Sequence, residues 1–208
     1  MAYPTVSAPY GLKPINRFDG IPYAGATQQL PIASTYNTAI YNGDVVLVNG
    51  GYIKKSAVTS DSTTDKANNA TYGVFMGVQY VNTQGQTVQA QYYPGNSAAT
   101  TAIAYVVMDP AAEFKVAVTY AGNSTIAGTT VAAVGTNAAL IQGTGSATTG
   151  DSGVSLAQPA AGAGNAAALP VRIVAVVPET ASNATTFTEV VVKFNNPQIL
   201  LAAGNDFA

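Results

Sequence analysis

Short runs of Val, Ile, Tyr and Thr, separated by turn residues, dominate the chain from residue 28 onward. Apolar positions within the runs alternate with polar ones or form brief continuous stretches, and both patterns are typical of β-strands. We predict strands over residues 29–33, 44–48, 52–55, 73–81, 87–93, 101–108, 114–120, 171–177 and 188–194. The pattern therefore favours an all-β fold, an antiparallel β-sandwich or barrel with little helix.

Turn residues strengthen the prediction for some of these strands. Asn49, Gly50 and Gly51 separate two strand-like runs, and all three accept the positive φ that a tight hairpin requires. Residues 114–120 alternate cleanly, so we expect that strand to bury one face. Asp109 and Pro110 predict a turn or a single helical turn before it.

An N-terminal arm, residues 1–22, has a different pattern. Four prolines within it exclude a helix or a central strand, so we expect the arm to run extended. It also carries apolar side chains that need a surface to lie on, which is either this domain's own surface or a neighbour's. These residues are Tyr3, Tyr10, Leu12, Ile15 and Phe18.

Two further regions are predicted to be loops. Residues 56–70 are polar and read as an exposed loop, and residues 122–169 are rich in Ala, Gly and Thr, with Asp151 as the one charged residue. We expect the second region to lie over the sheet as a long, loosely regular loop, with one short helix near residues 130–134. At 208 residues, the chain is expected to form a single domain, residues 1–208.

Composition narrows the possible functions. Only 9% of the residues are charged, the net charge is -2, and His, Cys and Trp are absent. We therefore expect no binding to nucleic acid, no histidine or thiol chemistry and no disulfides. No signal peptide and no transmembrane helix are expected, which predicts assembly in the cytoplasm. A surface with so little charge favours association, which suggests a component of an assembly.

Motifs that resemble catalytic sites lack essential partners. The sequence Gly150-Asp151-Ser152-Gly153 resembles a serine-protease loop, but the chain has no histidine to act as the base. Residues 145–152 resemble a phosphate-binding loop, but Asp151 occupies the position of the required lysine. The acidic pairs Asp61/Asp65 and Asp109/Glu113 are interpreted as a solvated loop and a turn cap. We thus expect no catalytic, cofactor-binding or metal-binding residues and no enzymatic activity.

The order and spacing of several segments resemble a family of virion structural proteins of tailed phages, of the kind found in aquatic phages, which act as head decoration or capsid cement proteins. In the first half, the segments are 8–14 (APYGLKP), 31–34 (PIAS), 41–46 (YNGDVV), 73–77 (GVFMG) and 91–94 (QYYP). In the second half they are Asp109-Pro110, 114–116 (FKV), 170–174 (PVRIV) and 190–195 (VVVKFN). The region 122–169 is longer and richer in Ala and Gly than this resemblance leads us to expect.

This resemblance implies a β-rich protein on the outside of a phage head, with the major capsid protein as its partner and a homotrimer as its oligomeric state. We expect the arm, Tyr3 to Phe18, to make the capsid or inter-subunit contact. Deleting residues 1–20 is then expected to abolish head binding and to leave the β-sheet circular-dichroism signal intact.

Two alternatives stay open. One is a tail or neck structural protein, which differs from a head protein in copy number. The other is a carbohydrate-binding virion surface module that uses exposed tyrosines as stacking platforms. The tyrosines considered for that role are Tyr36, Tyr41, Tyr92 and Tyr93.

Overall fold

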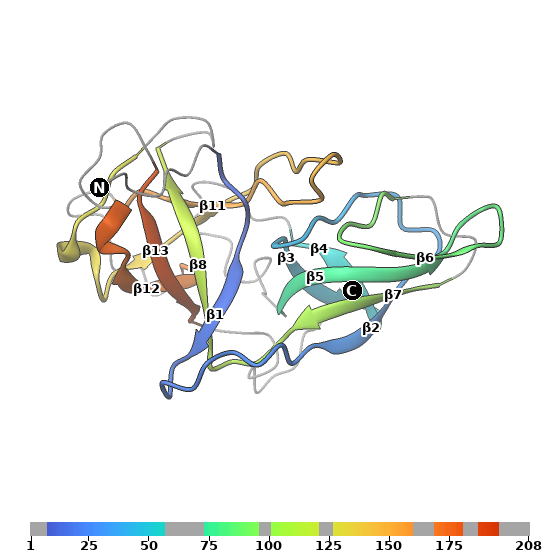
Figure 1. Cartoon of the computed structure of the whole chain (residues 1–208), viewed down its shortest axis with the longest axis horizontal. Coiled ribbons are helices and arrows are strands. Elements are labelled where there is room, and N and C mark those ends of the chain that lie inside the picture. Colours follow the sequence, from blue (N-terminus) through green and yellow to red (C-terminus); the bar gives the residue numbers. More distant parts are fainter. Residues whose placement is uncertain are drawn as a thin grey trace.

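The computed structural model describes residues 8–56, 73–95, 101–120, 127–159, 169–180 and 187–195. Its fold is all-β, as the sequence predicts, and consists of two sheets, one of them nearly barrel-shaped. The two sheets lie side by side along the long axis of the molecule, and the segment between β1 (Lys13–Arg17) and β2 (Gln28–Ile32) leads from the first sheet to the second (Figure 1). We refer to them as the first sheet, which contains β8 (Ala112–Thr119), and the second sheet, which contains β5 (Gly73–Val81).

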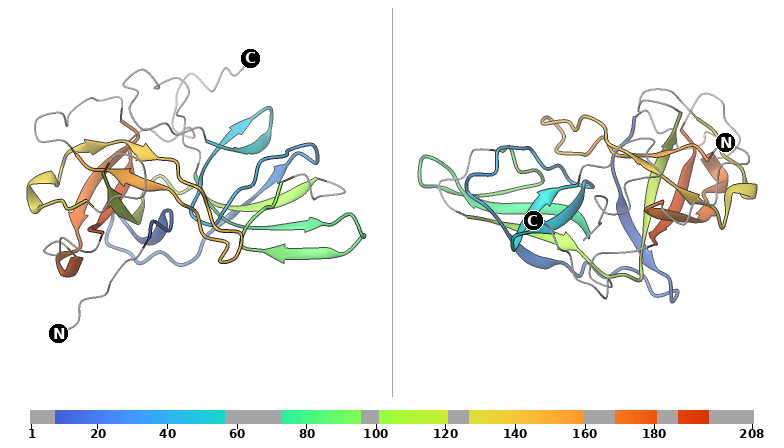
Figure 2. Two further views of the ribbon diagram at one scale, coloured as in Figure 1. Left: turned by 90° about the horizontal axis from the view of Figure 1, so that it is seen from above. Right: turned by 180° about the vertical axis from the view of Figure 1, so that it is seen from behind.

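The first sheet has seven strands in the order β10-β11-β8-β13-β12-β9, and β1 pairs with β8 beside this path. Its terminal strands, β10 and β9, are separated in the chain only by Ala139, so the sheet curls back on itself (Figure 2). The strands are β1 (Lys13–Arg17), β8 (Ala112–Thr119), β9 (Asn137–Ala138), β10 (Leu140–Ile141), β11 (Ser155–Ala157), β12 (Val171–Val176) and β13 (Glu189–Phe194).

The second sheet has six antiparallel strands in the order β2-β7-β5-β3-β4, and β6 pairs with β5. The outer strands β2 and β4 also contact each other, which indicates strong curvature. The strands are β2 (Gln28–Ile32), β3 (Val45–Asn49), β4 (Tyr52–Lys55), β5 (Gly73–Val81), β6 (Thr87–Ala90) and β7 (Ala102–Val107).

The predicted hairpin at residues 44–55 is confirmed as β3 and β4. Gly50 and Gly51 form its turn with φ values of 57° and 82°, a conformation that costs glycine little and other residues more. The predicted strands at 29–33, 73–81, 101–108, 171–177 and 188–194 are also confirmed, with ends that differ by at most one residue. The strand predicted over 87–93 ends earlier, at Ala90.

The expectation of a loop over residues 122–169 is wrong for much of the region that the structure describes. β9, β10 and β11 are strands of the first sheet, and Leu140, Val154 and Leu156 are buried in its core. The short helix expected near 130–134 is present as a 3-10 turn, Val131–Ala133. A second 3-10 turn, Pro178–Thr180, follows β12. Almost all of the predicted loop at 56–70 lies outside the described residues.

β8 differs from the expectation of a single buried face. Apart from Lys115, every residue of the strand is buried, so both of its faces are covered, and β8 is also flanked by strands on both edges. β13 pairs with one edge, and β1 and β11 share the other, β1 along the first half of the strand and β11 along the second. The strand is therefore central in the first sheet.

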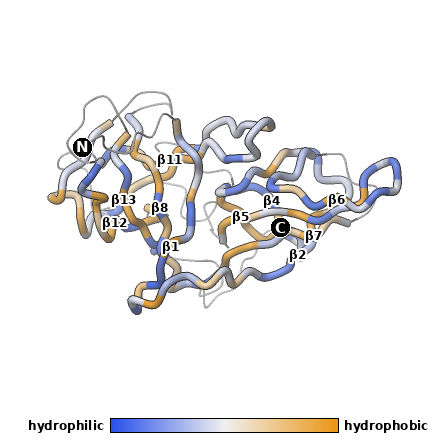
Figure 3. Tube along the Cα trace, in the orientation of Figure 1, coloured by the Kyte–Doolittle hydropathy of each residue, from blue (hydrophilic) through white to orange (hydrophobic). Residues whose placement is uncertain are grey.

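Each sheet encloses an apolar cluster, and apolar positions recur along β8 and β12 of the first sheet and along β5 and β7 of the second (Figure 3). The second sheet's cluster is built around Phe75 and Tyr93, both fully buried. The first sheet's cluster also takes in Val45, Val74 and Val107, which belong to strands of the second sheet. Leu12 of the arm belongs to the same cluster. The two sheets are therefore joined by apolar packing.

Leu12 is expected to contribute strongly to stability. Its side chain is fully buried, so Leu12→Ala should lower the free energy of unfolding by about 2 to 5 kcal/mol. Urea unfolding followed by circular dichroism measures the change. Ile21→Ala, at an exposed position of the same arm, is the matched control and should shift stability by less than about 0.5 kcal/mol. Equal effects of the two substitutions would contradict the burial of Leu12.

Candidate functional site on the N-terminal arm

Residues 8–22 are the described part of the arm, and their central strand β1 lies along the edge of β8. The register runs from Lys13 opposite Lys115 to Arg17 opposite Ala112, with an irregularity between Pro14 and Asn16. Proline has no N–H to donate, so an edge strand with a bulge is where a sheet tolerates it. The arm is thus bound to its own domain along β1.

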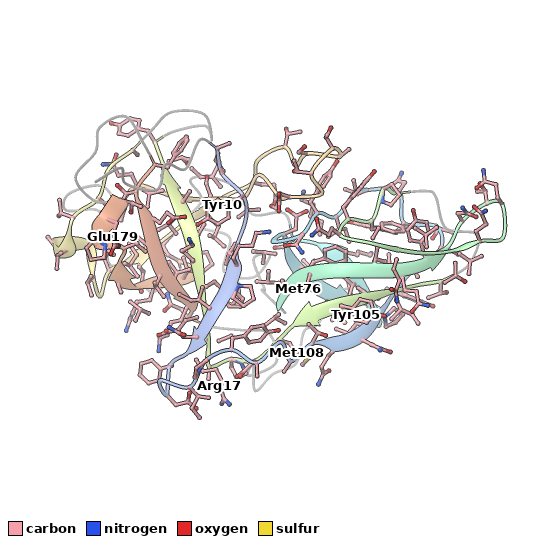
Figure 4. All side chains as sticks on the ribbon, in the orientation of Figure 1. Tyr10, Arg17, Met76, Tyr105, Met108 and Glu179 are labelled. Atoms are coloured by element: carbon pink, nitrogen blue, oxygen red, sulfur yellow. The ribbon has the colours of Figure 1, made fainter. Side chains whose placement is uncertain are left out.

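Tyr10 anchors the arm ahead of β1. Its hydroxyl donates a hydrogen bond to Glu189 Oε1 at 2.5 Å, and Lys115 Nζ lies 3.1 Å from the same carboxylate. Lys115 Nζ also lies 5.8 Å from the centre of the Tyr10 ring. Burial raises the pKa of Tyr10 far above its ordinary value, and the hydrogen bond and negative charge of Glu189 raise it further. Figure 4 labels Tyr10 and Arg17 near opposite ends of this part of the arm.

The apolar arm residues divide into two groups. Leu12 is buried in the core and Ile15 is half-buried, so the expectation that Leu12 is available for a capsid contact is wrong. Tyr10 is half-buried and held by Glu189. Tyr3 lies outside the described residues. Phe18 is exposed, and among the four predicted contact residues that the structure describes it alone offers a largely exposed apolar side chain.

Phe18 and Ile21 project from the turn that follows β1, with 64% and 54% of their surfaces exposed. The turn is closed by hydrogen bonds from Arg17 N to Ile21 O at 2.8 Å and from Gly20 N to Arg17 O at 2.9 Å. Phe18 N donates to Ala111 O at 2.7 Å, which fixes the turn to the residue just before β8. The exposed side chains are therefore carried by an ordered backbone.

The Phe18 ring also has one internal contact. Lys193 Nζ on β13 lies 4.4 Å from the ring centre, within the range of a cation–π interaction. The rest of the ring is available to solvent. We call Phe18 and Ile21 the exposed apolar pair.

A polar cluster lies where the arm meets both sheets. Lys13 Nζ donates to Asn42 Oδ1 at 2.7 Å and to Asp151 Oδ1 at 2.8 Å. Asn42 Nδ2 donates to the carbonyl of Met76 on β5 at 2.7 Å. Just before β1, Leu12 N donates to Gly43 O at 3.0 Å. The arm is thereby tied to the turn that precedes β3.

The buried carboxylate of Asp44 lies beside this cluster. It accepts hydrogen bonds from Tyr41 N at 2.8 Å and from Ser152 Oγ at 2.6 Å, and it pairs with Lys55 Nζ at 2.9 Å. Ser152 thus holds a buried carboxylate and Asp151 holds a lysine of the arm, which gives the Gly-Asp-Ser-Gly sequence a role in joining the sheets. Sequence reasoning missed Asp44 as a polar centre, because Ser152, the partner that links it to the first sheet's side of the junction, lies 108 positions away in the chain.

Two glycines permit the close approach of the arm to this turn. A Cβ on Gly11 would lie 2.7 Å from Ser152 Cβ and 2.8 Å from Gly43 O, and the φ of Gly11 is 81°. Gly43 has φ 94°, and a Cβ there would lie 3.0 Å from Gly11 Cα. Larger residues at either position would push the arm away from β3.

The acidic pairs agree with the structural interpretation where they can be seen. Asp109 Oδ1 accepts a hydrogen bond from Ala111 N at 2.8 Å, as a turn cap does, and Asp109 Oδ2 lies 3.1 Å from Arg17 Nε. Asp61 and Asp65 lie outside the described residues. Among the residues that the structure describes, no cluster of His, Cys, Asp or Glu is arranged to hold a metal ion.

The tyrosines considered as glycan platforms are engaged with one another. Tyr93 is fully buried, so its expected exposure is wrong, and it stacks on Tyr36 at 6.4 Å between ring centres. Tyr41 stacks on Tyr92 at 5.4 Å. All but Tyr93 are half-buried. These rings therefore pack the second sheet and the junction, with little free face for a sugar.

Comparison of the chain with protein-family models, with curated proteins and with solved structures finds no match. Within the described part of the chain, no helix is long and apolar enough to span a membrane.

Tyr10 should make stability fall at high pH. Its folded-state pKa lies above the unfolded value of about 10, so its contribution is complete below pH 10 and is lost as the pH rises above that value. Unfolding free energies measured between pH 9 and 11.5 should therefore fall more steeply for the wild type than for Tyr10→Phe. Parallel curves for the two proteins would show that the Tyr10 phenol ionises equally in both states.

Proposed function

We propose that this protein is a structural virion protein that binds the outside of a phage head and cements the capsid by bridging major capsid protein subunits, as a homotrimer. The exposed apolar pair, Phe18 and Ile21, is the observation that carries the proposal, because it places an aromatic and an aliphatic side chain in water on a fixed turn. The segment resemblance to decoration proteins supplies the class of partner.

A fixed turn suits a binding role energetically. Binding costs conformational entropy wherever a loop must become ordered, and a contact that is already ordered avoids that cost. Aromatic side chains at the centre of a contact often supply most of its binding energy. Phe18 fits this description because its backbone N–H is held by Ala111, just before β8, and its ring lies against Lys193 of β13.

Low charge supports the same role. With 9% charged residues, the surface offers little electrostatic repulsion between copies or toward a shell. Copies bound to one lattice also gain affinity through multivalency, so each contact needs only modest strength. Folding into a stable β-rich body that presents an apolar contact is sufficient for cementing.

Deleting residues 1–20 is a poor test of this proposal, and the expectation of an unchanged β-sheet signal conflicts with the structure. The deletion removes β1 from the edge of β8 and Leu12 from the core. Loss of binding would then follow from misfolding alone. Substitutions in the exposed apolar pair avoid this difficulty.

The double substitution Phe18→Ser and Ile21→Ser should weaken binding to heads that lack the protein by about tenfold or more, because each exposed apolar side chain buried at a contact contributes on the order of 1 to 2 kcal/mol. Co-sedimentation with such heads measures the affinity. Val131→Ser, at a 75% exposed position of the 3-10 turn Val131–Ala133, is the matched control and should bind normally. Full binding by the double variant would refute the assigned contact.

Copy number separates a head protein from a tail or neck protein. Quantitative mass spectrometry of purified particles should give a molar ratio near one chain per major capsid protein subunit. This ratio follows if trimers occupy the three-fold positions of the lattice. A ratio corresponding to a handful of copies per particle would exclude the cement role and favour the tail or neck.

A further inference from the structure

Three side chains in the polar cluster have the composition of an amide-forming site. Lys13 comes from the arm, Asn42 from the turn before β3, and Asp151 from the segment before β11. Lys13 Nζ contacts the Asn42 carboxamide oxygen at 2.7 Å and the Asp151 carboxylate at 2.8 Å. A primary amine, a carboxamide and a carboxylate are thus in direct contact.

We propose that Lys13 and Asn42 join in an intramolecular isopeptide bond, with Asp151 carrying the proton. This proposal concerns the chain itself and is independent of the proposed binding to a phage head. The bond would tie the arm covalently to the second sheet, at the point where the arm leaves the core and enters β1.

The amide is held in a suitable orientation. Asn42 is buried, and its Nδ2 donates to Met76 O at 2.7 Å, which turns the carboxamide oxygen toward Lys13. Its backbone is fixed as well, because Asn42 N donates to Gly150 O and Asn42 O accepts from Ser152 N, both at 2.9 Å. An amine fixed against a carbonyl group behaves as if its concentration were very high, which accelerates attack on an otherwise unreactive amide.

The reaction balances without a co-reactant. The Lys13 ammonium gives a proton to Asp151, and the resulting amine attacks Cγ of Asn42. The bond between Cγ and Nδ2 breaks, and the nitrogen leaves as ammonia after taking the proton back from Asp151. The attacking nitrogen then loses a second proton, which the released ammonia takes up. The products are therefore the Lys13–Asn42 amide and one ammonium ion. No oxidant or reductant takes part.

Two neighbouring lysines lack one component each. Lys54 Nζ donates to Asn49 Oδ1 at 3.2 Å, but no carboxylate pairs with it among the described residues. Lys55 Nζ pairs with Asp44 and lies over the Tyr41 ring. The Gln142 carboxamide donates to the same carboxylate at 3.5 Å, but among the described residues no carboxamide contacts Lys55 Nζ itself. The chain therefore contains a lysine–asparagine contact without an acid, which is an internal control.

A competing reaction at the same asparagine has to be distinguished. Asn42 precedes Gly43, and attack by Gly43 N on the side-chain amide would form a succinimide with the same loss of ammonia. In the structure, Gly43 N instead donates to Phe75 O at 2.8 Å, which directs it away from the side chain. Loss of mass alone is therefore not a sufficient test.

The test is mass spectrometry of the full-length folded protein. The intact mass should be lower than the sequence mass by about 17 Da, the mass of ammonia lost on amide formation. Trypsin should release residues 1–17 and 18–54 as one linked species, since Lys13 and Asn42 lie in these two peptides. A full sequence mass for the folded wild-type protein would overturn the proposal.

Variants separate the possible origins of the lost mass. Lys13→Arg keeps the positive charge but supplies no reactive amine, so this variant should have its full sequence mass. A succinimide does not need Lys13, so a loss of about 17 Da that persists in Lys13→Arg would overturn the proposal. Asp151→Asn should restore the full mass in a protein with wild-type circular dichroism. Lys54→Arg, at the control contact, should leave the loss of 17 Da unchanged, and its disappearance in that variant would contradict the assignment to Lys13.

Discussion

A carboxylate removed from water needs hydrogen-bond donors, and Asp44 takes its donors from three separate stretches of the chain. Its own turn supplies Tyr41 N, β4 supplies Lys55, and the segment before β11 supplies Ser152. Removing one partner of a buried charge costs several kcal/mol, so the folded state has to bring all three stretches together. The position of the first sheet relative to the second is set at this point, next to the apolar packing of Val45 and Val74.

The arm is built into the same junction. Gly11 and Gly43 allow two backbones to approach closely, and the hydrogen bond from Leu12 N to Gly43 O joins them. Lys13 then reaches Asn42, so consecutive residues of the arm contact consecutive residues of the turn. Residues 8–14 and 41–46 therefore meet in space, although about thirty positions separate them in the sequence.

The sequence pattern predicted those strands whose own residues favour a strand. The sequence predicts β3 and β4 by a continuous apolar run followed by a glycine turn, and it predicts β5, β12 and β13 by runs of Val, Ile and Phe. β9 to β11 carry no such pattern, since Asn137–Ala138 and Ser155–Ala157 are ordinary loop compositions. They become strands because β12 and β8 offer edges to pair with. The contact of Asp44 with Ser152 spans 108 positions, and nothing near either residue indicates it.

In the arm, too, the sequence pattern alone did not show which residues contact each other. Its apolar residues predicted a surface to lie on, but the sequence could not assign each side chain to this domain or to a partner. Folding uses Leu12 fully and Tyr10 in part, and it leaves Phe18 to solvent. If one residue both packed in the core and contacted a partner, a substitution there would change stability and binding together. Leu12 lies just before β1 and the exposed apolar pair lies on the turn after it, so substitutions in the pair can test the proposed contact without removing a side chain that the core uses.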